Sequence, residues 1–146
     1  MTMKKMNLTT MIVFFCLVIA NGAPAQEVSK GKQLVNMLTN KEDPDKVIML
    51  AKNIDSANWR DNKGVSLLAY ASFFGYKNVC KVLLDKGAKV DLMYTDGSTA
   101  LMSATGNHHA GVIKLLLDHG ANTNVQDTTG NTALISASCN GDTEIV

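Results

Sequence analysis

The sequence predicts an all-α repeat solenoid, in which helix-turn-helix units are stacked side by side. Three residue types recur at a constant spacing of 33 positions: Gly64, Gly97 and Gly130; Leu68, Leu101 and Leu134; Ala71, Ala104 and Ala137. The same spacing carries Val79 onto Val112 and Ile145, where a second helix of each unit is expected. A period of this length is typical of small supersecondary units stacked in an array rather than of one globular fold.

Residues 1–25 are typical of a cleavable secretory signal. Lys4 and Lys5 form a basic start, residues 11–20 form an apolar core, and Ala23-Pro24-Ala25 supplies the small residues that precede a cleavage point. A membrane anchor is disfavoured, because a spanning helix needs roughly 20 apolar residues and this run is about half that length. We therefore expect an exported protein, periplasmic or secreted after cleavage near Ala25, with no membrane association afterwards.

The charge balance argues against a nucleic-acid partner. The chain has 14 basic and 13 acidic residues, and removal of Lys4 and Lys5 with the signal would leave a net charge of −1. Nucleic-acid binders carry clustered Lys and Arg on one face, and no such cluster is present. Beyond the signal, Cys80 and Cys139 fall in units that are two apart, and a unit in a linear stack contacts only its neighbours. We expect free thiols, with Cys80 buried.

Residues 26–60 are expected to form a polar lead, up to residue 30, and then an N-terminal capping unit. Apolar residues recur at helical spacing over positions 34–38, and Asp43 followed by Pro44 is a typical capped start of a second helix. Ile54 stands where the later units have glycine. Terminal units of a stack are expected to be atypical, because one face of such a unit meets water.

Residues 61–93 contain the signals of a complete unit. Gly64 permits the positive φ of a tight turn. The Ser66 hydroxyl can cap the first helix by accepting a hydrogen bond from a backbone N–H that has no partner inside the helix. Gly75 separates the two helices, and Gly87 ends the second helix with a left-handed cap. The turn glycine and the capping residue recur in residues 94–126 and again in residues 127–146, which form a partial unit.

The motifs resemble the ankyrin repeat. The resemblance is carried by residues 97–104, 112–117 and 120–124, and again by Gly64–Ala71 and Gly130–Ala137. It is strong over residues 61–146 and weak over 30–60. It implies antiparallel helix pairs, β-hairpin-like loops at about right angles to them, and a non-catalytic protein-binding scaffold without a cofactor.

The sequence departs from this family at several positions. The family's Thr-Pro-Leu-His is Thr-Ala-Leu-Met over residues 99–102, His108 replaces the glycine between the helices, and Tyr94 replaces a loop aspartate. The middle unit is therefore expected to be locally distorted between Ala104 and Gly111. The sequence stops at Val146, early in a second helix and without a polar cap, which predicts fraying, self-association through this end, or a truncated product.

No catalytic or metal-binding constellation is evident. Adjacent residues of a helix point about 100° apart, so His108 and His109 cannot share a metal ion as an i, i+4 pair would. His119 lies in a polar turn. We therefore do not expect an enzyme.

The resemblance places partner contacts on the loop tips and on the groove-facing side of the first helices. The corresponding tip residues are Asn62, Lys63, Val65, Thr95, Asp96, Ser98, Thr128, Thr129 and Asn131, and the groove positions are Phe73, Phe74, Gly106, Asn107, Cys139 and Asn140. Phe73 and Phe74 are the foremost candidates, because aromatic anchors dominate interface energetics; the alternative is that one folds down as core. Trp59 is expected to pack between loops.

The sequence thus indicates an exported protein-interaction module. Its partner would be another protein, bound through the loop tips and the groove. Two alternatives stay open: an accessory subunit or inhibitor of an envelope enzyme, and a truncated fragment without function.

Overall fold

The computed structural model describes residues 25–140, with side chains described for residues 30–138. This part of the chain forms seven helices: α2 (Ala25–Thr39), α3 (Pro44–Lys52), α4 (Leu67–Phe73), α5 (Lys77–Asp85), α6 (Ala100–Gly106), α7 (Ala110–Asp118) and α8 (Ala133–Asn140). Within the same residues there is no strand, only one isolated antiparallel bridge between Arg60 and Ser66 at the base of a loop. The predicted all-α class is confirmed.

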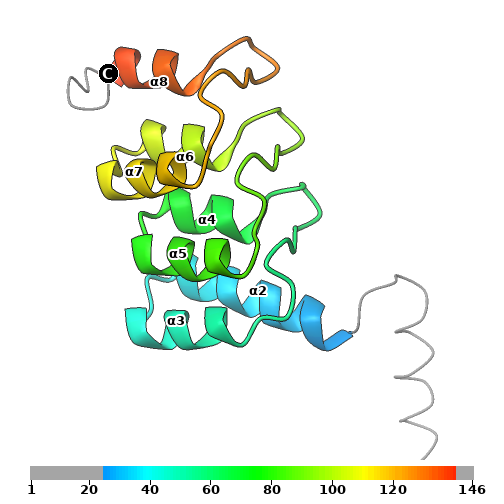
Figure 1. Cartoon of the computed structure of the whole chain (residues 1–146). Coiled ribbons are helices and arrows are strands. Elements are labelled where there is room, and N and C mark those ends of the chain that lie inside the picture. The colour runs from blue at the N-terminus through cyan, green and yellow to red at the C-terminus, as the bar shows by residue number, and fades with distance from the viewer. Residues whose placement is uncertain (1–24, 141–146) are drawn as a thin grey trace, which may run out of the picture.

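The helices are stacked in two layers. Figure 1 shows α2, α4, α6 and α8 following one another in one layer, with α3, α5 and α7 in the other. Helix α4 contacts α2 and α6 in its own layer and α5 in its own pair, while α5 contacts α3 and α7. The loops that join one pair to the next all project from the same side of the stack (Figure 1).

Side-chain oxygens cap the helices where the sequence predicted them. Ser66, Thr99 and Thr132 each accept the amide of the residue three positions later, at 3.2, 3.4 and 3.3 Å. Asp43 precedes Pro44, which starts α3, and accepts the amide two positions later at 3.0 Å. Such caps satisfy amides that have no partner inside the helix.

The recurring apolar residues fill the space between the pairs. Leu68 and Leu101 are buried between successive first helices, and small alanines, including Ala104, allow those helices to approach closely. Leu134 has the same position in α8 but is 52% exposed. Helix α8 contacts α6, and within the described residues no further helix covers its other side.

Polar bonds join one unit to the next in the same register as the apolar core. The Asn58 side-chain oxygen accepts the amide of Lys89 at 2.8 Å, and the Asp91 carboxylate, 33 positions later, accepts the amide of Asn122 at 2.9 Å. The residues before position 61 therefore stack on the next unit as the later units do.

The turn in the middle unit is regular, so the distortion expected there is wrong. His108 has φ 59°, close to the φ of 76° at Gly75. The amide of His109 donates to the Ala104 carbonyl at 3.0 Å, and the residues 33 positions earlier make the same bond at 2.9 Å. The chain keeps the turn by placing a histidine in the left-handed region, which costs an L-residue about 1–2 kcal/mol.

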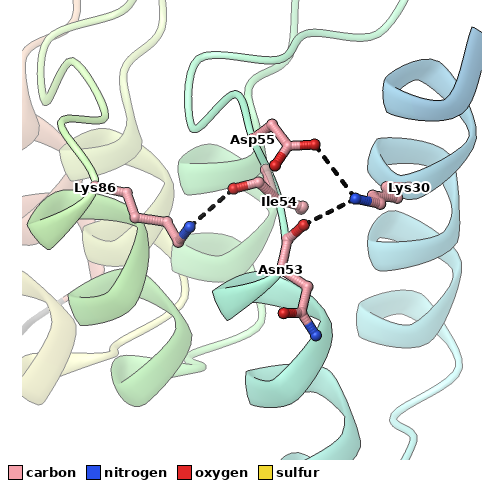
Figure 2. A network of polar contacts seen from close by, with 5 residues as sticks. All are labelled: Lys30, Asn53, Ile54, Asp55 and Lys86. Carbon is pink, nitrogen blue, oxygen red and sulfur yellow. Dashed lines mark hydrogen bonds and ion pairs between the residues drawn. The ribbon is translucent and has the colours of Figure 1, made fainter. Parts of the chain in front are cut away.

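The capping unit replaces a glycine cap with two lysine side chains. Ile54 lies where later units have a glycine of positive φ. Figure 2 shows the Lys30 ammonium group donating to the Asn53 carbonyl at 3.1 Å and the Lys86 ammonium group donating to the Ile54 carbonyl at 2.9 Å. Lys30 also contacts the Asp55 carboxylate at 3.3 Å. Charged donors thus satisfy carbonyls at the end of α3.

The N-terminal helix is longer than expected, because the residues of the polar lead, 26–30, are part of α2. Residues 1–24 of the predicted signal (residues 1–25) and the partial second helix after residue 140 lie outside the described residues. None of the described helices is long and apolar enough to cross a membrane.

Candidate functional site

Two cavities meet on the side of the stack formed by the first helices and the loops. The larger, of about 470 Å³, is here called the Trp59 cavity and is lined by Lys32, Val35, Asn36, Trp59, Arg60, Asp61, Asn62 and Tyr70. The smaller, of about 250 Å³, is called the Phe73 cavity and is lined by Val65, Ala69, Tyr70, Phe73, Phe74, Tyr94 and Ser103. Tyr70 lines both, so the two cavities adjoin at this residue, and together they are here called the groove.

The indole of Trp59 forms a wall of the larger cavity by packing against α2. A Cβ atom added to Gly31 would lie only 2.5 Å from Cδ2 of the indole, so the ring lies directly against the helix backbone. Trp59 is half-buried. This differs from the expected packing between loops, and it fixes the position of α2 relative to the loop.

A hydrogen-bonded pair holds Tyr70 at the junction of the two cavities. The Tyr70 hydroxyl donates to Asp61 at 2.8 Å, and the other carboxylate oxygen accepts the amides of Lys63 and Val65 at 2.8 and 2.9 Å. Burial raises the pKa of Asp61, but the Tyr70 hydroxyl, the two amides and the Lys63 charge together hold that pKa below its usual value. Burial and the adjacent carboxylate raise the pKa of Tyr70. The pair is therefore a neutral phenol bonded to a carboxylate.

The next unit makes the equivalent contact, but here the tyrosine is on the loop and its partner is on the helix. Tyr94 stands 33 positions after Asp61, and Ser103 stands 33 positions after Tyr70. The Tyr94 hydroxyl and the Ser103 hydroxyl are 2.8 Å apart, so a tyrosine now extends from the loop to a small residue on the helix. Burial raises the pKa of Tyr94 above its usual range. The aromatic ring thus lies in the groove in both units.

The two phenylalanines divide between surface and core. Phe73, the last residue of α4, is 48% exposed, whereas Phe74 is half-buried and packs against the core. Their rings meet edge to face, with centroids 5.0 Å apart and planes at 81°, a favoured geometry for aromatic pairs. Phe74 therefore supports Phe73 from below and leaves its outer face open.

The loop-tip candidates are mostly exposed, and many of them stabilise their own turns. Of these residues, Asn62 lines the Trp59 cavity and Val65 lines the Phe73 cavity. Asp96 accepts the amide of Ser98 at 3.0 Å, and its carbonyl accepts the amide of Thr128 at 2.9 Å. The exposed tip residues are Asn62, Lys63, Thr95, Asp96, Thr128, Thr129 and Asn131.

The remaining candidates contribute less to the groove. The side-chain amide of Asn107 donates to the Ser103 carbonyl of its own helix at 2.8 Å, and both Thr129 and Asn131 bond to Asp127. Asn140 belongs to α8, but its side chain lies outside the described residues.

Sequence reasoning missed ten of the fourteen groove residues: Lys32, Val35, Asn36, Trp59, Arg60, Asp61, Ala69, Tyr70, Tyr94 and Ser103. Tyr70 could have been found, because it is three positions before Phe73 and residues at that spacing share a helix face. The residues of α2 gave no signal, since the resemblance to the repeat is weak there.

The described residues contain no group of three or more His, Cys, Asp or Glu side chains arranged to hold a metal ion. His109 Nε2 lies 3.0 Å from the Phe73 carbonyl and His119 Nδ1 lies 2.8 Å from the Leu115 carbonyl, so both rings bond to backbone. Cys80 is a buried free thiol, as expected, and burial raises its pKa to about 12. Such a thiol is a poor nucleophile at neutral pH.

Comparison with known proteins identifies the repeats. A family model described as "Ankyrin repeats (3 copies)" matches residues 89–146, the segment that contains α6, α7 and α8. A comparison with curated proteins gave no match. The helix pairs before residue 89 stack in the same register, as the paired bonds of Asn58 and Asp91 show. Residues 89–146 of this chain are therefore similar to ankyrin repeats, and the helix pairs before them are stacked in the same way.

Proposed function

We propose that the chain is an exported protein-binding module that holds its partner in the groove. Ankyrin repeats imply a protein-binding module, and the repeats of residues 89–146 supply this class of function. The single observation that carries the location is Phe73, which is 48% exposed and lines a cavity. Large apolar side chains at a surface mark interaction sites, and aromatic ones are frequent energetic centres of interfaces.

The expected contribution of Phe73 follows from its exposed area. Complete burial of a phenylalanine side chain is worth roughly 1.5–3 kcal/mol. Because about half of this side chain is already covered, a partner that covers the rest should gain about 1 kcal/mol, or roughly a fivefold change in Kd. The preformed support from Phe74 adds to this, because little side-chain freedom remains to be lost on binding.

Affinity capture with mass spectrometry tests this proposal. The tagged full chain would be compared with Phe73→Ser and with Met49→Ser, which removes a 67% exposed apolar side chain from α3 in the other layer. We expect one protein to be enriched by the parent and by Met49→Ser, and to be lost with Phe73→Ser. Circular dichroism would verify that both variants are helical. Equal capture by all three chains would refute the groove as the binding surface.

The nature of the captured protein also decides the biological role. An enzyme as the captured partner would make this chain an accessory subunit or an inhibitor. Export is part of the proposal and is supported by the basic start and apolar core of residues 1–25. N-terminal sequencing of the cellular product should find Gln26 first, and an intact Met1 would refute export by cleavage.

A second copy of the chain is the other candidate partner. It is favoured by an opening of about 250 Å³ between α6, α7 and α8, lined by Leu117 and Leu134, which are 43% and 52% exposed. Sedimentation velocity should then show a concentration-dependent dimer that Leu134→Asp abolishes. A monomer at all concentrations would refute self-association.

A further inference from the structure

The two ends of the groove differ in chemistry, and from this we infer that its ligand is an extended peptide with a carboxylate close to a large apolar side chain. The inference rests on the proposed function and names the chemistry of the partner segment. The carboxylate would lie in the Trp59 cavity and the apolar side chain in the Phe73 cavity.

The Trp59 cavity presents two cations without an acidic partner. Lys32 on α2 and Arg60 on the adjoining loop are both exposed and line the cavity. The only ion pair among the described residues joins Lys30 to Asp55, so no carboxylate of that part of the chain forms an ion pair with either cation. Arg60 donates one N–H to the Met93 carbonyl at 3.3 Å, and a guanidinium group has five donors, so others remain for a ligand.

The one carboxylate in that cavity is already satisfied. Asp61 accepts the Tyr70 hydroxyl and two backbone amides at 2.8–2.9 Å, which spread its charge over three donors. It therefore competes only weakly for Lys32 and Arg60. Two cationic residues and one carboxylate line the cavity, so a ligand carboxylate meets a net positive site.

The Phe73 cavity has no free polar group to match a charge. Its polar hydroxyl pair, Tyr94 with Ser103, is closed on itself at 2.8 Å. The Tyr70 hydroxyl is bonded to Asp61, and the remaining side chains are the apolar Val65, Ala69, Phe73 and Phe74. Burial of a charge there would cost far more than burial of an aliphatic or aromatic group.

The groove favours an extended peptide over the other anionic ligands. Asn36 and Asn62 line the Trp59 cavity, and their amide groups can pair with both the N–H and the C=O of a peptide backbone. Two cations are too few for nucleic acid, whose binders neutralise several phosphates. The apolar cavity beyond Tyr70 has no counterpart in a simple anion.

Selection from a displayed library of random ten-residue peptides tests the inference. The immobilised full chain would be the bait, and affinities of selected peptides would be measured through Trp59, the only tryptophan of the chain. We expect Asp or Glu to be enriched within a few residues of Phe, Trp, Tyr or Leu. For such a peptide, Lys32→Gln should weaken binding by about fivefold, the upper end for an exposed ion pair. The control Lys81→Gln, an exposed lysine on α5, should leave it unchanged.

The outcomes separate this inference from the proposed function. Peptides that are lost with Phe73→Ser but carry no enriched acid would overturn the inference and leave the groove as a binding surface. Acid-containing peptides that Lys32→Gln and Lys81→Gln weaken equally would also overturn the inference. Peptides that bind Phe73→Ser as tightly as the parent would overturn the groove itself.

Discussion

Replacement of Gly31 by alanine tests the contact that builds the wall of the Trp59 cavity. Gly31 is buried in α2, and an added Cβ would meet the indole of Trp59 at 2.5 Å from Cδ2, 2.6 Å from Cε2 and 2.8 Å from Cγ. These atoms belong to the body of a rigid ring and not to the end of a flexible side chain. The indole must therefore move away as a unit.

Two opposing effects set the size of the change. Alanine is more favourable than glycine inside a helix by about 1 kcal/mol, because it loses less backbone freedom on folding. Overpacking a well-packed site typically costs about 1–3 kcal/mol. At this separation from the ring we expect the upper part of that range, so Gly31→Ala should lower the free energy of unfolding by about 1–2 kcal/mol.

Denaturant unfolding followed by the fluorescence of Trp59 measures both consequences. The unfolding midpoint should fall, and the native emission should shift to the red as the displaced ring meets water. Gly106→Ala is the matched control, because Gly106 is also helical and an added Cβ would meet nothing within 4 Å. It should be neutral or stabilise by up to about 1 kcal/mol with unchanged emission. If the two variants behave alike, the packing of Trp59 on α2 is wrong.

Three further predictions follow from the backbone and from the titrating groups. His108→Gly should raise the free energy of unfolding by up to about 1 kcal/mol in thermal or denaturant melts, because it relieves a positive φ; a lower stability would refute strain at this turn. In native chain at about pH 8, peptide mapping should find Cys80 unmodified by iodoacetamide, because burial raises its pKa to about 12; native labelling as fast as in denaturant would contradict this. The pKa of Asp61 is lowered in the folded chain, so its stabilisation is present above the unfolded pKa of about 3.9 and is lost as the pH falls through the folded value. Asp61→Asn should therefore flatten the acid limb of the stability curve, and an unchanged limb would refute the contribution.

The repeated part of the fold could be predicted because each position has a local physical cause. A cap such as Ser66 and a left-handed glycine such as Gly87 act within a few residues, so the sequence around them is sufficient. The packing of Trp59 could not be predicted in this way. It depends on Gly31, which is 28 positions earlier and in a unit whose register the motif does not define.

The turn at His108 shows a different limit. The loss of a glycine was expected to distort the loop, yet the stacked helices on both sides fix its ends and its hydrogen bonds. The surrounding packing stabilises the turn by more than the left-handed conformation costs, so the residue adapts to the fold. The conformational preference of one residue indicates strain at a turn, but it does not tell whether the turn or the residue changes conformation.

The groove shows why a position-by-position comparison of repeats underestimates a site. When each repeat position is compared alone, the change from Asp61 to its counterpart Tyr94 looks like the loss of a loop aspartate. The structure shows that its hydrogen-bond partner changes at the same time, from Tyr70 to Ser103, so that the contact and the ring in the groove are both retained. A search for two repeat positions that change together from one unit to the next would have found both tyrosines.

The groove residues are concentrated where the chain departs most from regular repeats. Phe73 and Phe74 have Gly106 and Asn107 as their counterparts one unit later, so the aromatic pair occurs only once in these two units. Lys32 and the residues beside it come from α2, outside the segment that matches the family. The regular units supply buried leucine and alanine layers that hold the helices in place. The proposed partner would therefore be chosen mainly by the irregular N-terminal half, and transfer of residues 89–146 alone to another scaffold should not transfer binding.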